Sequence, residues 1–130
     1  MVKVVKVVDD VNKELYHELN INSSYFVNHW TCHKHGKVVL LTIYSIKNIS
    51  STATNINIGF IPAGFAPSYT VLCTTLGHGS NTNTKFVFTF RAKSTATDSR
   101  LITVAKYNSS YSGQETINHT VCYPTNDPGD

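Results

Sequence analysis

The chain has 130 residues, a formal net charge of +3 and only 15% charged residues, while Ser, Thr and Asn supply 40 positions. This length suits a single domain, and no apolar run approaches the length needed to span a membrane. Charges so few and so scattered exclude a nucleic-acid-binding face, which requires clustered Lys and Arg beside exposed aromatic residues.

Acidic residues are confined to the two ends of the sequence. No Asp or Glu occurs from Ile21 to Thr97, although that span contains six Lys or Arg residues. A mildly positive body favours an anionic partner, such as a phosphate-bearing cell-wall polymer. Scattered, solvated lysines explain the same pattern without any partner.

The three cysteines predict free thiols rather than a disulfide framework. Cys32, Cys73 and Cys122 are odd in number and far apart in the chain. Neither a Cys-x-x-Cys pair nor the spacing of a zinc site is present. We therefore expect buried, reduced thiols in a protein made in a reducing cytoplasm.

Residues 1–20 differ from the rest of the chain and hold half of its acids. Four apolar residues recur there with spacings of four, three and four: Val4, Val8, Val11 and Leu15. This is one seam of a heptad repeat and favours a short, oligomerising helical or coiled-coil stalk. The segment also fits a strand over residues 2–8, because β-branched residues favour extended backbone. A short helix through Leu19, capped by Asp9 or Asp10, would then follow.

Beyond residue 20 the pattern predicts an all-β head over residues 21–123. Short apolar or alternating runs are separated by turn residues. The expected strands are residues 25–34, 37–46, 55–61, 70–76, 85–92, 101–107 and 115–123. Strands at this spacing predict an antiparallel β-sandwich of jelly-roll type. Residues 124–130 are expected to form a flexible polar tail.

Two stretches carry distinctive motifs. One is Trp30-Thr-Cys-His-Lys-His-Gly-Lys-Val-Val-Leu, a tryptophan that leads into a turn glycine and an apolar strand. The other is Ile58-Gly-Phe-Ile-Pro-Ala-Gly-Phe-Ala-Pro-Ser-Tyr-Thr-Val. Together they resemble the W…G…V-V strand pair and the I-G-x-(I/L)-P-x-G-(F/Y)-x-P turn of C-terminal head domains in phage tail fibres and receptor-binding proteins. The resemblance extends over about residues 30–123.

The proline-glycine motif predicts a turn between two strands. Pro62 cannot donate to a strand ladder and should end the first strand. Gly64 permits a positive φ, and Pro67 should direct the chain into the next strand. Phe60 and Phe65 are expected to pack beneath the turn. These are scaffold roles, so the motif bears on the fold more than on a binding site.

The resemblance implies a homotrimer of heads on a helical neck, in a virion assembled from protein made in the host cytoplasm. It also implies recognition of a bacterial surface saccharide or cell-wall polymer, without a cofactor, nucleic acid or membrane insertion. Binding sites of such heads lie on variable loops, so the resemblance transfers no binding residue to this chain.

Few residues suit metal binding or catalysis. His33 and His35 are weak candidates for a metal site, because both side chains lie on one face of a strand. Ordinary exposed residues beside a turn explain them better, so no metal is expected. The long acid-free span leaves Asp98 and Glu115 as the only plausible carboxylate pair for hydrolysis, and no G-x-S-x-G pattern is present. The chain is therefore not expected to be an enzyme.

Saccharide binding requires aromatic faces beside amide, carboxylate or cationic groups. One loop and two turns near it combine these groups: Tyr107, Asn108, Tyr111 and Gln114, with His78, Asp98 and Arg100. The two tyrosines also fit a simpler role, covering the end of the sandwich. Trp30 is expected in the core or a subunit interface.

Three hypotheses follow. The first is a receptor-binding head of a phage tail fibre that attaches to a bacterial surface glycan. The second is a structural virion module, such as a collar, baseplate or fibre-joining part, that contacts another phage protein. The third is a free-standing lectin-like module.

Overall fold

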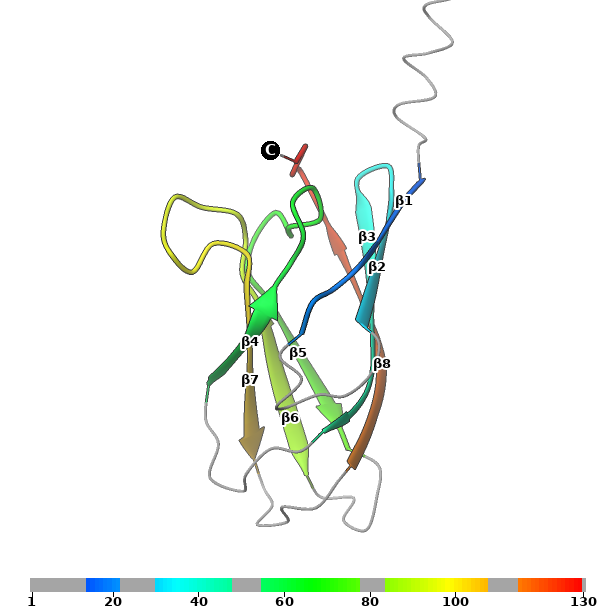
Figure 1. Cartoon of the computed structure of the whole chain (residues 1–130), viewed down its shortest axis with the longest axis vertical. Helices are drawn as coiled ribbons and strands as arrows, with labels where there is room; N and C mark the ends of the chain where they lie inside the picture. Colours follow the sequence, from blue (N-terminus) through cyan, green and yellow to red (C-terminus); the bar gives the residue numbers. More distant parts are fainter. Residues whose placement is uncertain (1–13, 22–29, 48–54, 78–83, 108–114, 130) are drawn as a thin grey trace, which may run out of the picture.

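The computed structural model describes residues 14–21, 30–47, 55–77, 84–107 and 115–129 (Figure 1). These residues contain eight strands and no helix. The strands are β1 (Glu14–Glu18), β2 (Trp30–His35), β3 (Val38–Lys47), β4 (Ile56–Phe60), β5 (Val71–Leu76), β6 (Lys85–Phe90), β7 (Leu101–Tyr107) and β8 (Glu115–Pro124). The expected all-β class is thereby confirmed. Within the described part of the chain, no helix is long and apolar enough to cross a membrane.

The strands form two four-stranded sheets, and every pairing is antiparallel. The first sheet has the order β1-β2-β3-β8, and the second has the order β4-β7-β6-β5. Among the described strands, consecutive strands lie in different sheets at two places, between β3 and β4 and between β7 and β8. In the second sheet β5, β6 and β7 are consecutive neighbours and β4 lies beside β7, which is the strand order of a Greek key.

The expected helix near the N-terminus is wrong for residues 14–18. Glu14 pairs with His35 and Glu18 with Thr31, so this segment is an edge strand of the first sheet. Leu15, the last member of the heptad seam, packs against the core. The error has a simple cause, because a spacing of four residues is also a multiple of the two-residue period of a strand. The other seam residues lie outside the described part of the chain.

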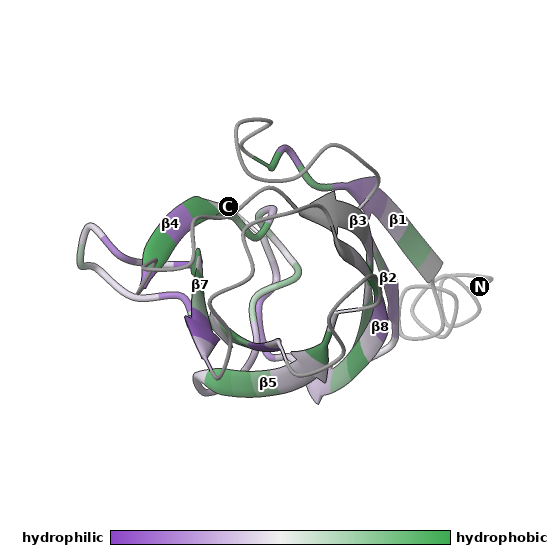
Figure 2. Ribbon diagram, turned by 90° about the horizontal axis from the view of Figure 1, so that it is seen from below, coloured by the Kyte–Doolittle hydropathy of each residue, from purple (hydrophilic) through white to green (hydrophobic). Residues whose placement is uncertain are grey.

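The core is formed by the inward-facing side chains of both sheets. Phe86, Phe88 and Phe90 are fully buried, as their alternation in the sequence predicts. Trp30 of the first sheet meets Phe88 of the second edge to face, with ring centroids 5.4 Å apart. Viewed from the end, the two sheets face each other around this core (Figure 2). Trp30 is therefore a core residue, one of the two positions expected for it.

The two sheets also meet at their edges. After β1 the chain crosses to the second sheet, where Ile21 forms an isolated antiparallel bridge with Gly59 of β4. A Cβ at Gly59 would lie 2.9 Å from the carbonyl oxygen of Asn20, so only glycine permits this approach. On the other side, β5 contacts β8.

The structure of the proline-glycine turn agrees with most of what its sequence predicts. β4 ends at Phe60, two residues before Pro62, and Gly64 has a φ of +92°. Phe65 is buried beneath the turn as expected, but Phe60 is 54% exposed and the expectation for it is wrong. Ile58 is buried, so simple alternation would also bury Phe60, but the register shifts between Asn57 and Gly59. This bulge turns Phe60, which pairs with Leu101, away from the core.

Candidate functional site

The two ends of the sheets carry different chemistry. We call the end at Leu76, Lys85 and Tyr107 the loop end, because these register partners of β5, β6 and β7 border the connections 77–84 and 108–114. The opposite end, where Thr125 to Gly129 lie, is the tail end. Lys85 and Phe90, the first and last residues of β6, are five steps apart, which separates the two ends by about 17 Å at 3.3–3.4 Å per residue.

Leu76, Lys85 and Tyr107 form one row across the outer face of the second sheet. Leu76 and Tyr107 are about half exposed. The Lys85 ammonium lies 5.8 Å from the centroid of the Tyr107 ring, within the range of a cation–π interaction. The row therefore combines an apolar side chain, a cation and an aromatic ring at the loop end of the second sheet.

Four further residues expected in the site belong to the segments that this row borders. His78 follows Gly77, the residue after β5, while Asn108, Tyr111 and Gln114 follow β7. All four lie outside the described residues. Because Leu76 and Tyr107 are in one row, the segments 78–83 and 108–114 both begin at the loop end.

Asp98 and Arg100 do not lie with Tyr107. They belong to the connection between β6 and β7, at the tail end, and the whole of β7 separates them from Tyr107. Asp98 forms an ion pair of 3.4 Å with Arg91, and both side chains are nearly half exposed. Arg100 has a positive φ of 61°, and its carbonyl accepts a hydrogen bond from the N–H of Ile61. Successive connections of an antiparallel sheet lie at alternate ends, which explains why these residues are separated.

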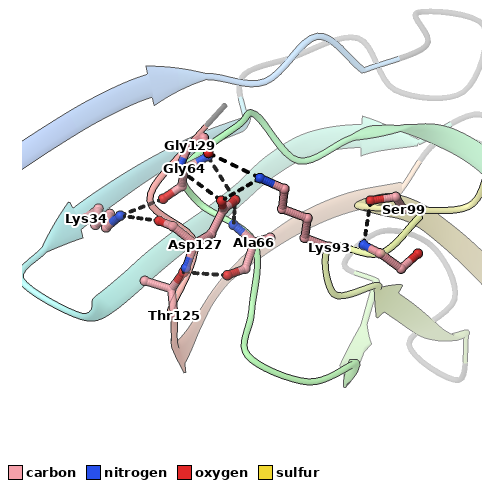
Figure 3. Close-up of polar contacts among 9 residues, drawn as sticks. Lys34, Gly64, Ala66, Lys93, Ser99, Thr125, Asp127 and Gly129 are labelled. Atoms are coloured by element: carbon pink, nitrogen blue, oxygen red, sulfur yellow. Dashed lines mark hydrogen bonds and ion pairs between the residues drawn. The ribbon is translucent and has the colours of Figure 1, made fainter. Parts of the chain in front are cut away.

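The tail end is organised by Asp127, which the sequence analysis did not single out (Figure 3). Its side chain is only 2% exposed. Oδ2 accepts hydrogen bonds from the N–H groups of Gly64 (2.9 Å) and Ala66 (3.2 Å), and Oδ1 accepts one from Gly129 (3.0 Å). The ammonium of Lys93 lies 3.5 Å from Oδ1. The carboxylate thus joins the C-terminal segment to the proline-glycine turn.

Neighbouring contacts strengthen the same connection. The Lys34 ammonium donates to the carbonyls of Gly64 (2.9 Å) and Asp127 (2.7 Å). The Thr125 hydroxyl donates to the carbonyl of Ala66, and the Tyr123 hydroxyl donates to that of Phe65 (2.7 Å). The expectation that this segment frays is therefore wrong for residues 124–129, because Thr125 and Asp127 are buried and hydrogen-bonded.

The Asp127 carboxyl has a lowered pKa. Burial by itself raises the pKa, but the N–H groups of Gly129, Ala66 and Gly64 and the charge of Lys93 outweigh it. The side chain is consequently an ionised acceptor at neutral pH. Its oxygens accept three backbone N–H groups, so it holds the C-terminal segment against the proline-glycine turn.

The histidines proposed for a metal lie on the outer face of the first sheet. The His33 ring meets the Tyr16 ring edge to face, with centroids 4.8 Å apart. His35 is exposed beside the turn to β3. Within the described part of the chain, no three His, Cys, Asp or Glu side chains are grouped closely enough to hold a metal ion.

The described thiols are free, but only two of them are buried. Cys32 and Cys73 face the core, and burial raises the pKa of both, that of Cys32 to about 12. Cys122 is exposed, which corrects the expectation that all three are buried. It lies on the outer face of β8, beside Leu40 of β3.

Comparison with known proteins does not assign the chain to a family. No protein-family model matches it, and no curated protein matches it with significant similarity. Its function must therefore be argued from the chemistry of its two ends and its outer faces.

Proposed function

We propose that this chain is the receptor-binding head of a phage or prophage tail fibre, which attaches to a bacterial surface saccharide or cell-wall polymer without a cofactor. The head is a homotrimer, and it acts in the virion as a binding module and not as an enzyme. The finer architecture that we infer is a β-sandwich. It contains one Greek key, β4 to β7, in place of the two that define a jelly roll.

One observation carries the proposal: the loop end presents Tyr107, Lys85 and Leu76 in one row on the outer face, and the segments 78–83 and 108–114 begin beside it. Tyr107 and Leu76 are about half exposed, and Lys85 is partly buried. An aromatic ring binds the apolar face of a sugar, and amide groups bind its hydroxyls. The adjoining segments supply such groups in Asn108, Gln114 and Tyr111. The tail end is instead closed by the Asp127 contacts, so it offers a scaffold and not a site.

The proline-glycine turn supports the same proposal. Gly64 has the positive φ and Pro62 the strand-ending position that the motif of tail-fibre heads requires. The buried Asp127 then fastens this turn to the C-terminal segment. The agreement of the turn with the motif supports the scaffold, and the residues of the loop end alone support the class of ligand.

The test is an array of bacterial surface saccharides and cell-wall polymers, probed with the wild-type chain and two tyrosine variants. Tyr107→Ala removes the ring at the loop end. Tyr69→Ala is the matched control, because Tyr69 is 63% exposed and precedes β5 at the tail end. We expect selective binding that Tyr107→Ala weakens about tenfold, the scale of one lost stacking contact, and that Tyr69→Ala leaves unchanged. Absence of binding to every saccharide and polymer would refute the proposal.

A second function is favoured by the outer face of the first sheet. Tyr16, Val38, Leu40 and Tyr44 are about half exposed on that face. Exposed apolar side chains gathered on one face often mark a protein contact. They support either the subunit interface of the trimer or, as the alternative, a structural virion module bound to another phage protein.

Light scattering on a sizing column tests the proposed trimer and its stalk. The full chain should have the mass of a trimer. The truncated chain for comparison should lack residues 1–13 and not 1–20, because β1 begins at Glu14 and belongs to the first sheet. A trimer that dissociates after this truncation supports a stalk, whereas a monomeric chain that binds saccharide supports a free-standing lectin-like module.

A further inference from the structure

The cation of the loop-end row is held on an aromatic ring. The Lys85 ammonium lies 5.8 Å from the centroid of Tyr107. A ring face attracts an ammonium without neutralising it, whereas a carboxylate partner would cancel its charge. Lys85 has no carboxylate partner among the residues that the structure describes. The ammonium beside the ring therefore keeps its charge and its N–H donors, and it remains able to bind an anion.

The charge of the surrounding sheet is of one sign. None of the four strands β4, β5, β6 and β7 contains Asp or Glu. A second lysine, Lys106, is buried beside the row, on the inward side of β7. The charged residues of these four strands are therefore lysines alone, Lys85 and Lys106.

The neighbours of Lys85 suit a ligand with an apolar side. Leu76 and Tyr107 flank it in the row, and the next row is Thr74, Val87 and Ala105, whose side chains are small or apolar. A sugar ring or polyol chain presents C–H groups to such a surface. An acidic group on the same ligand would then reach the ammonium.

We propose that Lys85 and Tyr107 form an anion-binding subsite, which selects saccharides or polyols bearing a phosphate or carboxylate group over neutral ones. The subsite rests on the proposed function, since it names the class of ligand that the loop end binds. The ammonium pairs with the acidic group, and the ring of Tyr107 packs against the adjoining carbon atoms.

Two acid–neutral pairs of small probes test the subsite in the full chain. Glycerol 3-phosphate is compared with glycerol, and glucuronic acid with glucose, by following the backbone amide signals of isotopically labelled protein. Titration to about 50 mM detects millimolar affinities. The variants are Lys85→Gln, Lys85→Arg and the control Lys37→Gln, since Lys37 is exposed at the tail end. The amide spectra themselves show whether each variant is folded.

The acidic probes should shift the amides of Lys85 and Tyr107 saturably and bind at least about fivefold more tightly than their neutral partners, as expected for one hydrogen-bonded charge pair. Lys85→Gln should abolish this preference, while Lys85→Arg and Lys37→Gln should retain it. Raising the salt concentration from about 0.05 to 0.5 M should weaken it. The more tightly bound acidic probe identifies the group as phosphate or carboxylate.

Equal affinity for acidic and neutral probes would overturn the subsite, as would an unchanged preference in Lys85→Gln or an absence of shifts in this row. Such a result, combined with selective binding of neutral saccharides on the array, would leave the attachment function standing. Conversely, acidic probes that bind at Lys85 while every saccharide and polymer fails on the array would retain the subsite and remove the proposed function.

Discussion

Replacing Asp127 with Asn should destabilise the fold more than its place near the C-terminus suggests. Oδ2 accepts two backbone N–H groups, and Oδ1 accepts a third beside the Lys93 ammonium. An amide has only one acceptor oxygen, so in either orientation its NH₂ group faces at least one buried backbone donor. A hydrogen bond to a charged group contributes about 1.5–3 kcal/mol, and an unpaired buried donor adds a further cost. We expect Asp127→Asn to lower the free energy of unfolding by about 3 kcal/mol at pH 7.

Urea denaturation followed by tryptophan fluorescence measures this loss. Trp30 is the only tryptophan and is buried against Phe88, so its emission reports exposure of the core. Asp98→Asn is the matched control, because its ion pair with Arg91 is nearly half exposed and should contribute less than about 1 kcal/mol. Equal effects of the two substitutions would refute the reasoning.

The same measurement against pH checks the charge of Asp127. Its pKa is lower in the folded chain than the value of about 3.9 for an unfolded aspartate. The ionised carboxylate therefore stabilises the fold above about pH 4, and this contribution is lost as the pH falls through the folded pKa. The advantage of the wild type over Asp127→Asn should be constant near neutral pH and shrink in acid. A difference that persists undiminished at about pH 2 would contradict this account.

Three other substitutions or reactions test separate features. Gly59→Ala should destabilise the chain by about 1–3 kcal/mol in urea, because the new Cβ would lie 2.9 Å from the Asn20 carbonyl oxygen; an unchanged midpoint would contradict the close edge contact. Thr84→Val should stabilise it by about 1 kcal/mol, since the Thr84 hydroxyl is buried with no hydrogen-bond partner among the described residues; a marked loss of stability would show that this hydroxyl is paired. A thiol reagent should label the exposed Cys122 quickly and the buried Cys32, whose pKa is about 12, only on unfolding, as mass spectrometry of the labelled peptides would show; rapid labelling of Cys32 in the native chain would refute its burial.

Much of the fold could be predicted because strand alternation depends only on the order of neighbouring residues. The Phe86, Phe88 and Phe90 pattern identified a strand and its buried face, and Leu101–Tyr107 matches its expected bounds. β1 was missed because Leu15 and Leu19 satisfy helical and strand spacing equally. Pairing with β2 selects the strand over the helix, and the local sequence of residues 14–18 does not show that pairing.

The candidate site could be predicted only in part, for a similar reason. Residue types group Tyr107 with Asp98 and Arg100, but in the fold the length of β7 separates it from both. Asp127 was missed because a polar C-terminal segment looks unstructured until the turn at Gly64 lies beside it. The signal that was present is the spacing of Asp127 and Gly129, which suits an aspartate that accepts a hydrogen bond from the N–H two residues later.

The most direct test of the proposed function is a crystal structure of the full chain with the saccharide that binds most tightly on the array. The account predicts that the saccharide lies against Tyr107, Lys85 and Leu76 at the loop end, with contacts from the adjoining segments 78–83 and 108–114. A saccharide bound instead on the outer face of the first sheet, or in the shallow hollow beside Lys93 and Asp127 at the tail end, would contradict it.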